Sequence, residues 1–397
     1  MALRFGLITG IERMLRYDSY LQITPFEWKR GIHKFTKVDT PWSRFWRKIG
    51  LLLCCVFSTL MLIECFKEDS MYTDLSQRFL AGSSASAIVF NIGTVWIMHT
   101  EYPTIIMVLN GILELENNFE IIARPGRIQR RNLMLIPTHF KVRFITALNN
   151  VFVWTVNTVP VLFALSSVID PTWPTNVVGG LGGFEEQGNG ILMSLMKGAN
   201  GVVNLVFWRF LFTLGALFQM QMLLIIVCTN GYQQALIRVQ SVERYDQLAL
   251  GYLRRIQLLL QLFNKVYSNI IVCLLFVLSF IQIVAVYMTV LRISGKLEIP
   301  LTVLVVTVVE VVDSYMVILA IYGIAGEVNK TCKHVKSKLE NKETNSTTIK
   351  RRARKFILKS IPNLKIKFAA VNFIEENTCL MFLDFNVGRV VDLLLLD

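Results

Sequence analysis

The chain alternates between long apolar runs and shorter polar segments. Five of the runs are long enough to cross a membrane, because a spanning helix needs about 20 mostly apolar residues. The third run in chain order is weaker because it contains three asparagines, and the last is the weakest because it contains charged residues. The seven spans predicted from this pattern are residues 49–66, 79–100, 144–167, 203–228, 269–291, 299–323 and 379–396.

The polar segments between the spans also carry a helical pattern. Apolar residues recur at steps of three and four through residues 232–267, which predicts helices that continue the fourth and fifth spans beyond the membrane. Residues 170–190 are rich in Gly and Pro and residues 341–350 are polar, so both predict loops. The pattern as a whole predicts an all-α, polytopic membrane protein with seven transmembrane helices.

Composition supports a lipid bilayer as the surroundings of this chain. Hydrophobic residues make up 53% of it and charged residues only 17%, against about 25% charged in an ordinary soluble domain. The net charge of +13 is concentrated between the apolar runs, which is typical of basic loops at a membrane. We therefore expect a membrane protein with no nucleic-acid partner.

Chemical motifs for catalysis or metal binding are absent from the sequence. The seven cysteines and four histidines do not show the spacing of a zinc site. No Gly-rich phosphate loop, GxSxG turn or HExxH helix occurs. We therefore expect no metal, no cofactor and no enzymatic activity.

The distribution of Lys and Arg orients the predicted spans. With the N-terminus in the cytoplasm, 34 of the 41 basic residues fall in cytoplasmic segments and only 5 fall outside. Cytoplasmic loops carry such an excess in membrane proteins of known orientation. The sequence therefore predicts a cytoplasmic N-terminus and, with seven spans, an extracellular C-terminus.

Seven spans with this orientation are the reverse of a G-protein-coupled receptor and resemble the arthropod gustatory and odorant receptor superfamily. The stretch VLNGILELENNFEII resembles the Leu-Asn…Leu…Glu helix of that family. The stretch LGYLRRIQLLLQLFNKVYSNIIVCLL, with Tyr252 and Asn264, resembles its approach to the fifth span. A basic inner helix, residues 350–378, followed by a short final span also matches. The last span, FLDFNVGRVVDLLLLD, lacks the Thr-Tyr…Gln-Phe signature of many gustatory receptors, so the chain most resembles a divergent gustatory receptor.

The resemblance implies a multi-pass protein of the plasma membrane that acts as a ligand-gated, non-selective cation channel. Its partners would be a small-molecule tastant or odorant and related subunits, in a homo- or hetero-tetramer. Four regions follow from it. They are a cytoplasmic N-terminal region (1–48), six transmembrane helices with a ligand-pocket bundle (49–323), a basic cytoplasmic anchor segment (324–378) and a pore-lining seventh helix (379–397).

Three charged residues in the last span are candidates for the pore: Asp384, Arg389 and Asp392. Charge in hydrocarbon is costly, so such residues usually face the interior of a bundle or water. Rings of Asp favour cations, and Asp384 and Asp392, eight residues apart, lie within about one-quarter turn of each other. The alternatives are an Arg389–Asp pair inside one subunit, or Asp392 at the outer membrane interface.

Polar and aromatic residues inside the other spans are candidates for ligand binding. Glu310 and Asp313 share one face of the sixth span and either bind a cationic or hydroxylated ligand or pair with Arg209 on the fourth. Aromatic walls with a few polar groups suit a small organic ligand, and ordinary helix packing is the alternative. The remaining candidates are Trp154, Asn157, Asn204, Trp208, Gln282 and Tyr287.

Other functions remain open from the sequence. An odorant receptor subunit that requires a co-receptor would have the same spans. A G-protein-coupled receptor would need an extracellular N-terminus, and a solute transporter would show uptake without an agonist-gated current. An accessory or inactive receptor subunit is a further alternative.

Overall fold

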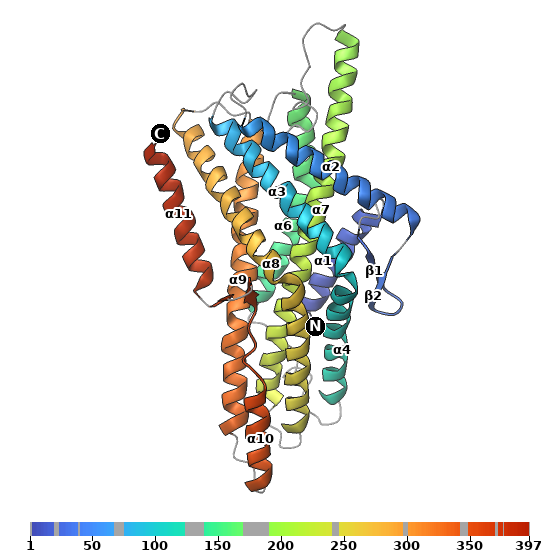
Figure 1. The fold of residues 1–397 in the computed structure, drawn as a ribbon, viewed down its shortest axis with the longest axis vertical. Coiled ribbons are helices and arrows are strands. Elements are labelled where there is room, and N and C mark those ends of the chain that lie inside the picture. The colour runs from blue at the N-terminus through green and yellow to red at the C-terminus, as the bar shows by residue number, and fades with distance from the viewer. Residues whose placement is uncertain are drawn as a thin grey trace.

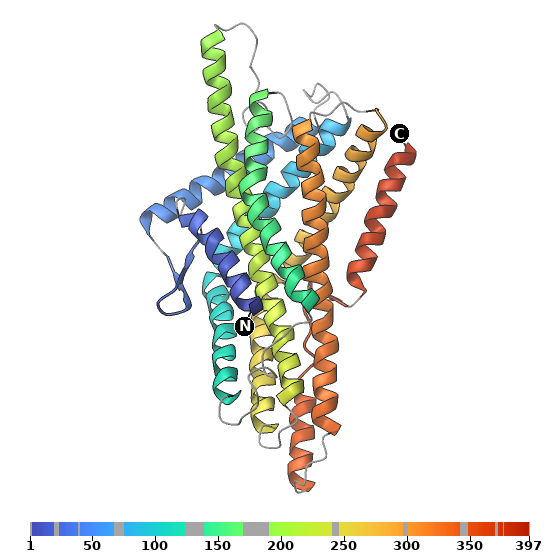
Figure 2. The same ribbon diagram turned by 180° about the vertical axis from the view of Figure 1, so that it is seen from behind.

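The structure is an elongated bundle in which long helices run side by side (Figures 1 and 2). It is a computed structural model that describes residues 2–19, 24–38, 40–66, 75–123, 139–169, 190–239, 246–296, 301–341, 348–369, 372–375 and 377–396. The helices are α1 (Ala2–Ser19), α2 (Pro41–Phe66), α3 (Leu75–Thr100), α4 (Tyr102–Ala123), α6 (His139–Ile169), α7 (Gly190–Val239), α8 (Asp246–Ile293), α9 (Leu301–Asn341), α10 (Thr348–Ser360) and α11 (Thr378–Leu396). The strands are β1 (Phe26–Lys29), β2 (Lys34–Lys37), β3 (Lys367–Phe368) and β4 (Asn372–Phe373).

Six described helices are long and apolar enough to cross a membrane by length and composition: α2, α3, α6, α7, α8 and α9. They contain the first five predicted spans and residues 301–323 of the sixth. Helix α11 covers the seventh predicted span with 19 residues, but its three charged residues set it apart from the other six. The predicted all-α, polytopic membrane fold is confirmed.

Helices α7 and α8 extend well past the thickness of a bilayer. They contain 50 and 48 residues, about 75 and 72 Å at the usual helical rise, whereas the hydrocarbon core is about 30 Å thick. This confirms that residues 232–239 continue the fourth span as helix and that residues 246–267 lead into the fifth span as helix. Residues 240–245 of this prediction lie outside the described part of the chain. Helix α10 lies at one end of the bundle and the C-terminus at the other (Figure 1). The cytoplasmic side of α10 and the predicted orientation stay predictions.

Helix α7 is the centre of the bundle. In its apolar stretch, 83% of the residues are buried, against 19% in α2, which crosses the outside of the bundle at an angle (Figures 1 and 2). A helix that is apolar all round belongs in a core or a membrane. The exposed apolar side chains of the outer helices, such as Leu52, Trp96 and Phe276, therefore form a surface suited to lipid.

The N-terminal region contains structure that the sequence pattern did not predict. Helix α1 packs against α6 and α7, and β1 and β2 form an antiparallel hairpin. The buried rings of Phe26 and Phe35 meet edge to face at 6.2 Å between centroids. Asn110 on α4 accepts a hydrogen bond from the Phe35 backbone N–H at 2.8 Å and donates one to its carbonyl at 2.9 Å. The amide of Asn110 thus ties the hairpin to the bundle.

The prediction of one helix over residues 350–378 is wrong. Helix α10 ends at Ser360, because Pro362 cannot donate a helical hydrogen bond and disfavours a helical residue before it. The chain then continues as an extended linker with the two-residue strands β3 and β4. Asn264 on α8 donates to the Lys365 carbonyl and accepts from the Lys367 backbone N–H, both at 2.9 Å. This amide fixes the linker that leads to α11.

A candidate ligand pocket and the seventh helix

A cavity lies between five helices: α3, α6, α7, α8 and α9. These helices contain the second to the sixth predicted spans. The cavity has a volume of about 120 Å³, which leaves room for a small organic molecule. Its polar lining residues are Ser83, Ser84, Asn91, Thr155, Gln219, Asp313 and Ser314.

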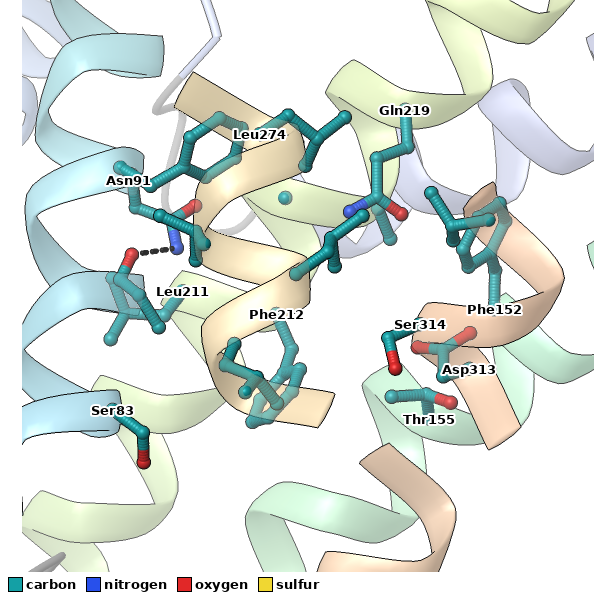
Figure 3. A pocket seen from close by; sticks show the side chains of 18 of the residues that line it. Ser83, Asn91, Phe152, Thr155, Leu211, Phe212, Gln219, Leu274, Asp313 and Ser314 are labelled. Atoms are coloured by element: carbon teal, nitrogen blue, oxygen red, sulfur yellow. Dashed lines mark hydrogen bonds between the residues drawn. The ribbon is translucent and has the colours of Figure 1, made fainter. Parts of the chain in front are cut away.

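One wall of the cavity carries a carboxylate and two hydroxyls. Asp313 and Ser314 come from α9 and Thr155 comes from α6, and the three side chains lie side by side (Figure 3). The Oδ1 atom of Asp313 is enclosed and has no hydrogen-bond partner among the described residues. None of the twenty lining residues is Lys, Arg or His. This wall therefore presents a carboxyl group and hydrogen-bond acceptors without a basic side chain beside them.

The opposite wall carries Asn91 on α3, with an apolar region between the two walls. Asn91 donates its Nδ2 to the Ala87 carbonyl at 2.9 Å, while its Oδ1 has no described partner (Figure 3). Leu211, Phe212 and Leu274 lie between Asn91 and the acidic wall (Figure 3). The cavity thus has polar groups on two walls and an apolar middle.

Aromatic side chains stiffen the α6–α7 side of the cavity. Trp208 lines the cavity and stacks on Phe163 with 4.5 Å between ring centroids and 19° between planes. Phe207 meets Trp208 edge to face at 5.6 Å. Such ring pairs are favourable beyond the area they bury, so Trp208 is held in one orientation toward the cavity.

The structure brings two of the nine predicted ligand-binding residues into the cavity lining, namely Trp208 and Asp313. Trp154 and Arg209 are exposed and do not line the cavity, and the side chain of Glu310 falls outside the described part of the chain. The others that do not line the cavity are Asn157, Asn204, Gln282 and Tyr287.

Two of these asparagines are satisfied on their own helices. Asn157 donates to the Val153 carbonyl at 2.6 Å, and Asn204 donates to the carbonyl of Asn200 and to its side-chain oxygen, each at 3.0 Å. These contacts correspond to the packing alternative. A ligand-binding role for the predicted residues outside the lining stays a prediction.

Polar lining residues on α3 and Gln219 on α7 were missed by the sequence analysis. Ser83 and Ser84 belong to a stretch rich in small residues, which reads as close helix packing. Asn91 was the available signal, because it is an amide in the otherwise apolar stretch AIVFNIG.

Helix α11 packs against α8 and α9 with one narrow face (Figure 1). The buried residues of that face are Cys379, Asn386 and Val390. The Nδ2 of Asn386 donates a hydrogen bond to the Oε1 of Gln282 on α8 at 2.5 Å, and both residues are buried. The neighbouring residue Ile281 lines the cavity. Consecutive residues of α8 thus contact the cavity and α11.

The predicted pore residues Asp384, Arg389 and Asp392 are all exposed on α11. Arg389 forms a salt bridge with Asp392 at 3.0 Å and lies over the ring of Phe385 at 5.1 Å. The intrasubunit pair that was the alternative for Arg389 is therefore present. Asp384 lies on the side of the helix away from Asn386, since two residues two positions apart differ by about 200°. Pore lining by these residues stays a prediction.

Comparison with known proteins places the fold. No protein-family model matches the chain, and no curated protein sequence matches it. The structure is similar to that of the insect olfactory receptor OR5 from Machilis hrabei, with a TM-score of 0.63 and 12% identity over 98% of each chain. It is also similar to the same receptor in complex with eugenol, with a TM-score of 0.68 and 12% identity over 99% of this chain and 100% of that one. The chain therefore shares the fold of the insect olfactory receptors.

Proposed function

We propose that this chain is a chemoreceptor of the plasma membrane that acts as a ligand-gated, non-selective cation channel and not as an enzyme. The observation that carries the proposal is a cavity between five helices of a bundle that has the same fold as a receptor solved with the small molecule eugenol. The proposed ligand is a small-molecule tastant or odorant. The proposed assembly is a tetramer of this chain or of this chain with related subunits.

The contacts of α8 support a route from the ligand to the channel. A ligand in the cavity touches the face of α8 that contains Ile281, and Gln282 holds α11 through Asn386. A ligand shifts a conformational equilibrium only by binding one state better than the other. In this mechanism the favoured state is one in which α8 has moved relative to α11, and the exposed face of α11 lines the pore.

The finer assignment that we propose is a gustatory-type receptor, with an odorant receptor subunit as the alternative. The gustatory assignment rests on the sequence resemblance, and the last span, which lacks the usual gustatory signature, is the reason for keeping the odorant alternative. The two assignments differ in what the chain needs. Currents from this chain expressed alone support a self-sufficient receptor, whereas currents only after co-expression of a co-receptor support the odorant alternative.

Whole-cell recording in oocytes tests the proposed function. The expected result is a cation current evoked by a member of a panel of sugars, bitter compounds and volatiles, in cells where G-protein signalling is blocked. Silence across the panel, with surface expression confirmed, contradicts the proposal. A tag at residue 1 tests the orientation, because it should be labelled only after permeabilisation. Labelling on intact cells would favour a G-protein-coupled receptor instead.

The substitution Asp392→Asn tests the pore assignment of α11. It removes a negative charge that attracts cations and leaves the positive charge of Arg389 without its carboxylate partner, so both effects lower the cation concentration near the helix. A unit charge about 6 Å from an ion in water changes the local cation concentration about threefold, and we expect a loss of cation conductance of that order. Glu340→Gln, an exposed carboxylate at the far end of α9, is the matched control. Unchanged conductance and reversal potential in Asp392→Asn would remove this residue from the pore.

A further inference from the structure

We propose that the ligand of this cavity is a small organic amine whose protonated amino group binds at Asp313 and whose apolar body fills the space between Leu211, Phe212 and Leu274. The proposal rests on the proposed function, since it names the ligand class for that site. It follows from the charge, the acceptors and the apolar middle of the cavity, taken in turn.

The carboxyl group of the cavity lining has no basic side chain beside it among the described lining residues. Asp313 contributes a carboxylate, and the twenty lining residues include no basic side chain. Arg209, which the sequence analysis considered as its partner, is exposed and does not line the cavity. A carboxyl group enclosed in a membrane bundle either holds a proton or is paired with a cation. A protonated amine is a cation that can pair with it.

The acceptors around Asp313 match the donors of a primary ammonium. An ammonium group has three N–H donors and no acceptor. Asp313 Oδ1 has no described partner. The hydroxyl of Ser314 donates to the Val311 carbonyl at 2.9 Å, which leaves its oxygen lone pairs as acceptors. Thr155 adds a third oxygen beside them (Figure 3). Three oxygens can thus receive the three N–H groups of one amine.

The rest of the cavity selects a compact apolar body. Leu211, Phe212 and Leu274 separate the acidic wall from Asn91 (Figure 3). The cavity volume of about 120 Å³ suits one ring with a short chain. A sugar would place hydroxyls against these apolar side chains, where they would lose hydrogen bonds to water. An arylalkylamine places its ring there and its charge at Asp313.

Three probes that share one carbon skeleton test the proposal: 2-phenylethylamine, 2-phenylethanol and ethylbenzene. Their binding to the purified full chain in lipid nanodiscs is measured at pH 7 by the shift in melting temperature with concentration, and their currents are recorded in oocytes. We expect the amine to bind at least tenfold more tightly than the alcohol, and the hydrocarbon to bind most weakly. The expected factor corresponds to a hydrogen bond with a charged group.

The variant Asp313→Asn keeps the shape of the side chain and removes its charge. We expect it to weaken binding of the amine at least tenfold and to change binding of the alcohol less than twofold, so that the preference disappears. Glu101→Gln is the matched control, because Glu101 lies between α3 and α4 and outside the cavity lining. It should leave all three affinities unchanged. If Asp313→Asn does not fold, Thr155→Val removes one acceptor and should weaken the amine selectively.

Several outcomes would overturn the inference. Equal or tighter binding of the alcohol, or an amine preference that survives Asp313→Asn, would assign the site to a neutral hydroxylated ligand. Failure of 2-phenylethylamine and of a series of primary amines to bind would also overturn it. In either case the proposed function stands if a neutral compound of the wider panel evokes a current, and it fails separately only if the whole panel is silent.

Discussion

The hydrogen bond between Asn386 and Gln282 makes a quantitative prediction about gating. It joins α11 to α8, one of the five helices that line the cavity, and both side chains are buried. Polar contacts between membrane helices contribute about 0.6 kcal/mol on average and up to about 1.7 kcal/mol. If the bond exists in only one gating state, its loss changes the equilibrium between the states by a factor of about three to eighteen.

The assay is the half-activating ligand concentration of Asn386→Leu, Gln282→Leu and the double variant. We expect both single variants to shift this concentration in the same direction by a factor in that range. The double variant should show no larger shift than either single one, because both substitutions remove the same bond. Thr94→Val is the control, since it removes a buried hydrogen bond within α3 alone.

Two results would refute this reasoning. If the effects of Asn386→Leu and Gln282→Leu add in the double variant, the two residues act independently and the bond does not carry the coupling. If neither variant shifts activation while both reach the surface, the bond is present equally in both gating states. In that second case the link between α8 and α11 is structural only.

Two further substitutions test the packing. Gly10→Ala would place a Cβ 2.0 Å from Asn149 Oδ1 and 2.8 Å from Met220 Cε, so we expect the protein to lose about 1–3 kcal/mol of stability and to melt at a lower temperature. The control Gly251→Ala has open space around it and should raise stability by up to about 1 kcal/mol. An unchanged melting temperature in Gly10→Ala would contradict the close approach of α1. Asn264→Leu should release the linker before α11 and increase cleavage of the linker by protease in the folded protein. Asn264→Asp keeps the acceptor for the Lys367 N–H and should show less cleavage. Equal resistance to protease in both variants would contradict the role of this amide.

The spans could be predicted because membrane insertion depends on a sum over about twenty residues, to which single polar residues contribute little. The span over residues 144–167 was found in spite of its three asparagines, and Asn157 is satisfied by its own helix. Local structure outside the membrane was harder to predict. Helix α1 was missed because its pattern is weak, and the end of α10 was placed 18 residues too late, although Pro362 gave the signal.

The site could be predicted only in part, because sequence gives the depth of a residue in a span but not the direction in which it faces. Trp154 and Trp208 both lie within predicted spans, yet Trp208 is buried at the cavity and Trp154 is exposed. Their directions depend on how five helices rotate about their axes during packing. Asp313 could be selected from the sequence because a carboxyl group stands out in an apolar span, whichever way that helix faces.

The linker before α11 also determines how that helix can move. Asn264 anchors the linker at Lys365 and Lys367, eleven residues before α11 begins at Thr378, while most of the surface of α11 is exposed. A helix of 19 residues is about 28 Å long, so a tilt of about 10° at its start would displace the far end by about 5 Å. In the proposed channel, α11 therefore acts as a lever, in which a small tilt at its start becomes a displacement large enough to admit or exclude a hydrated ion at the other end of the bundle.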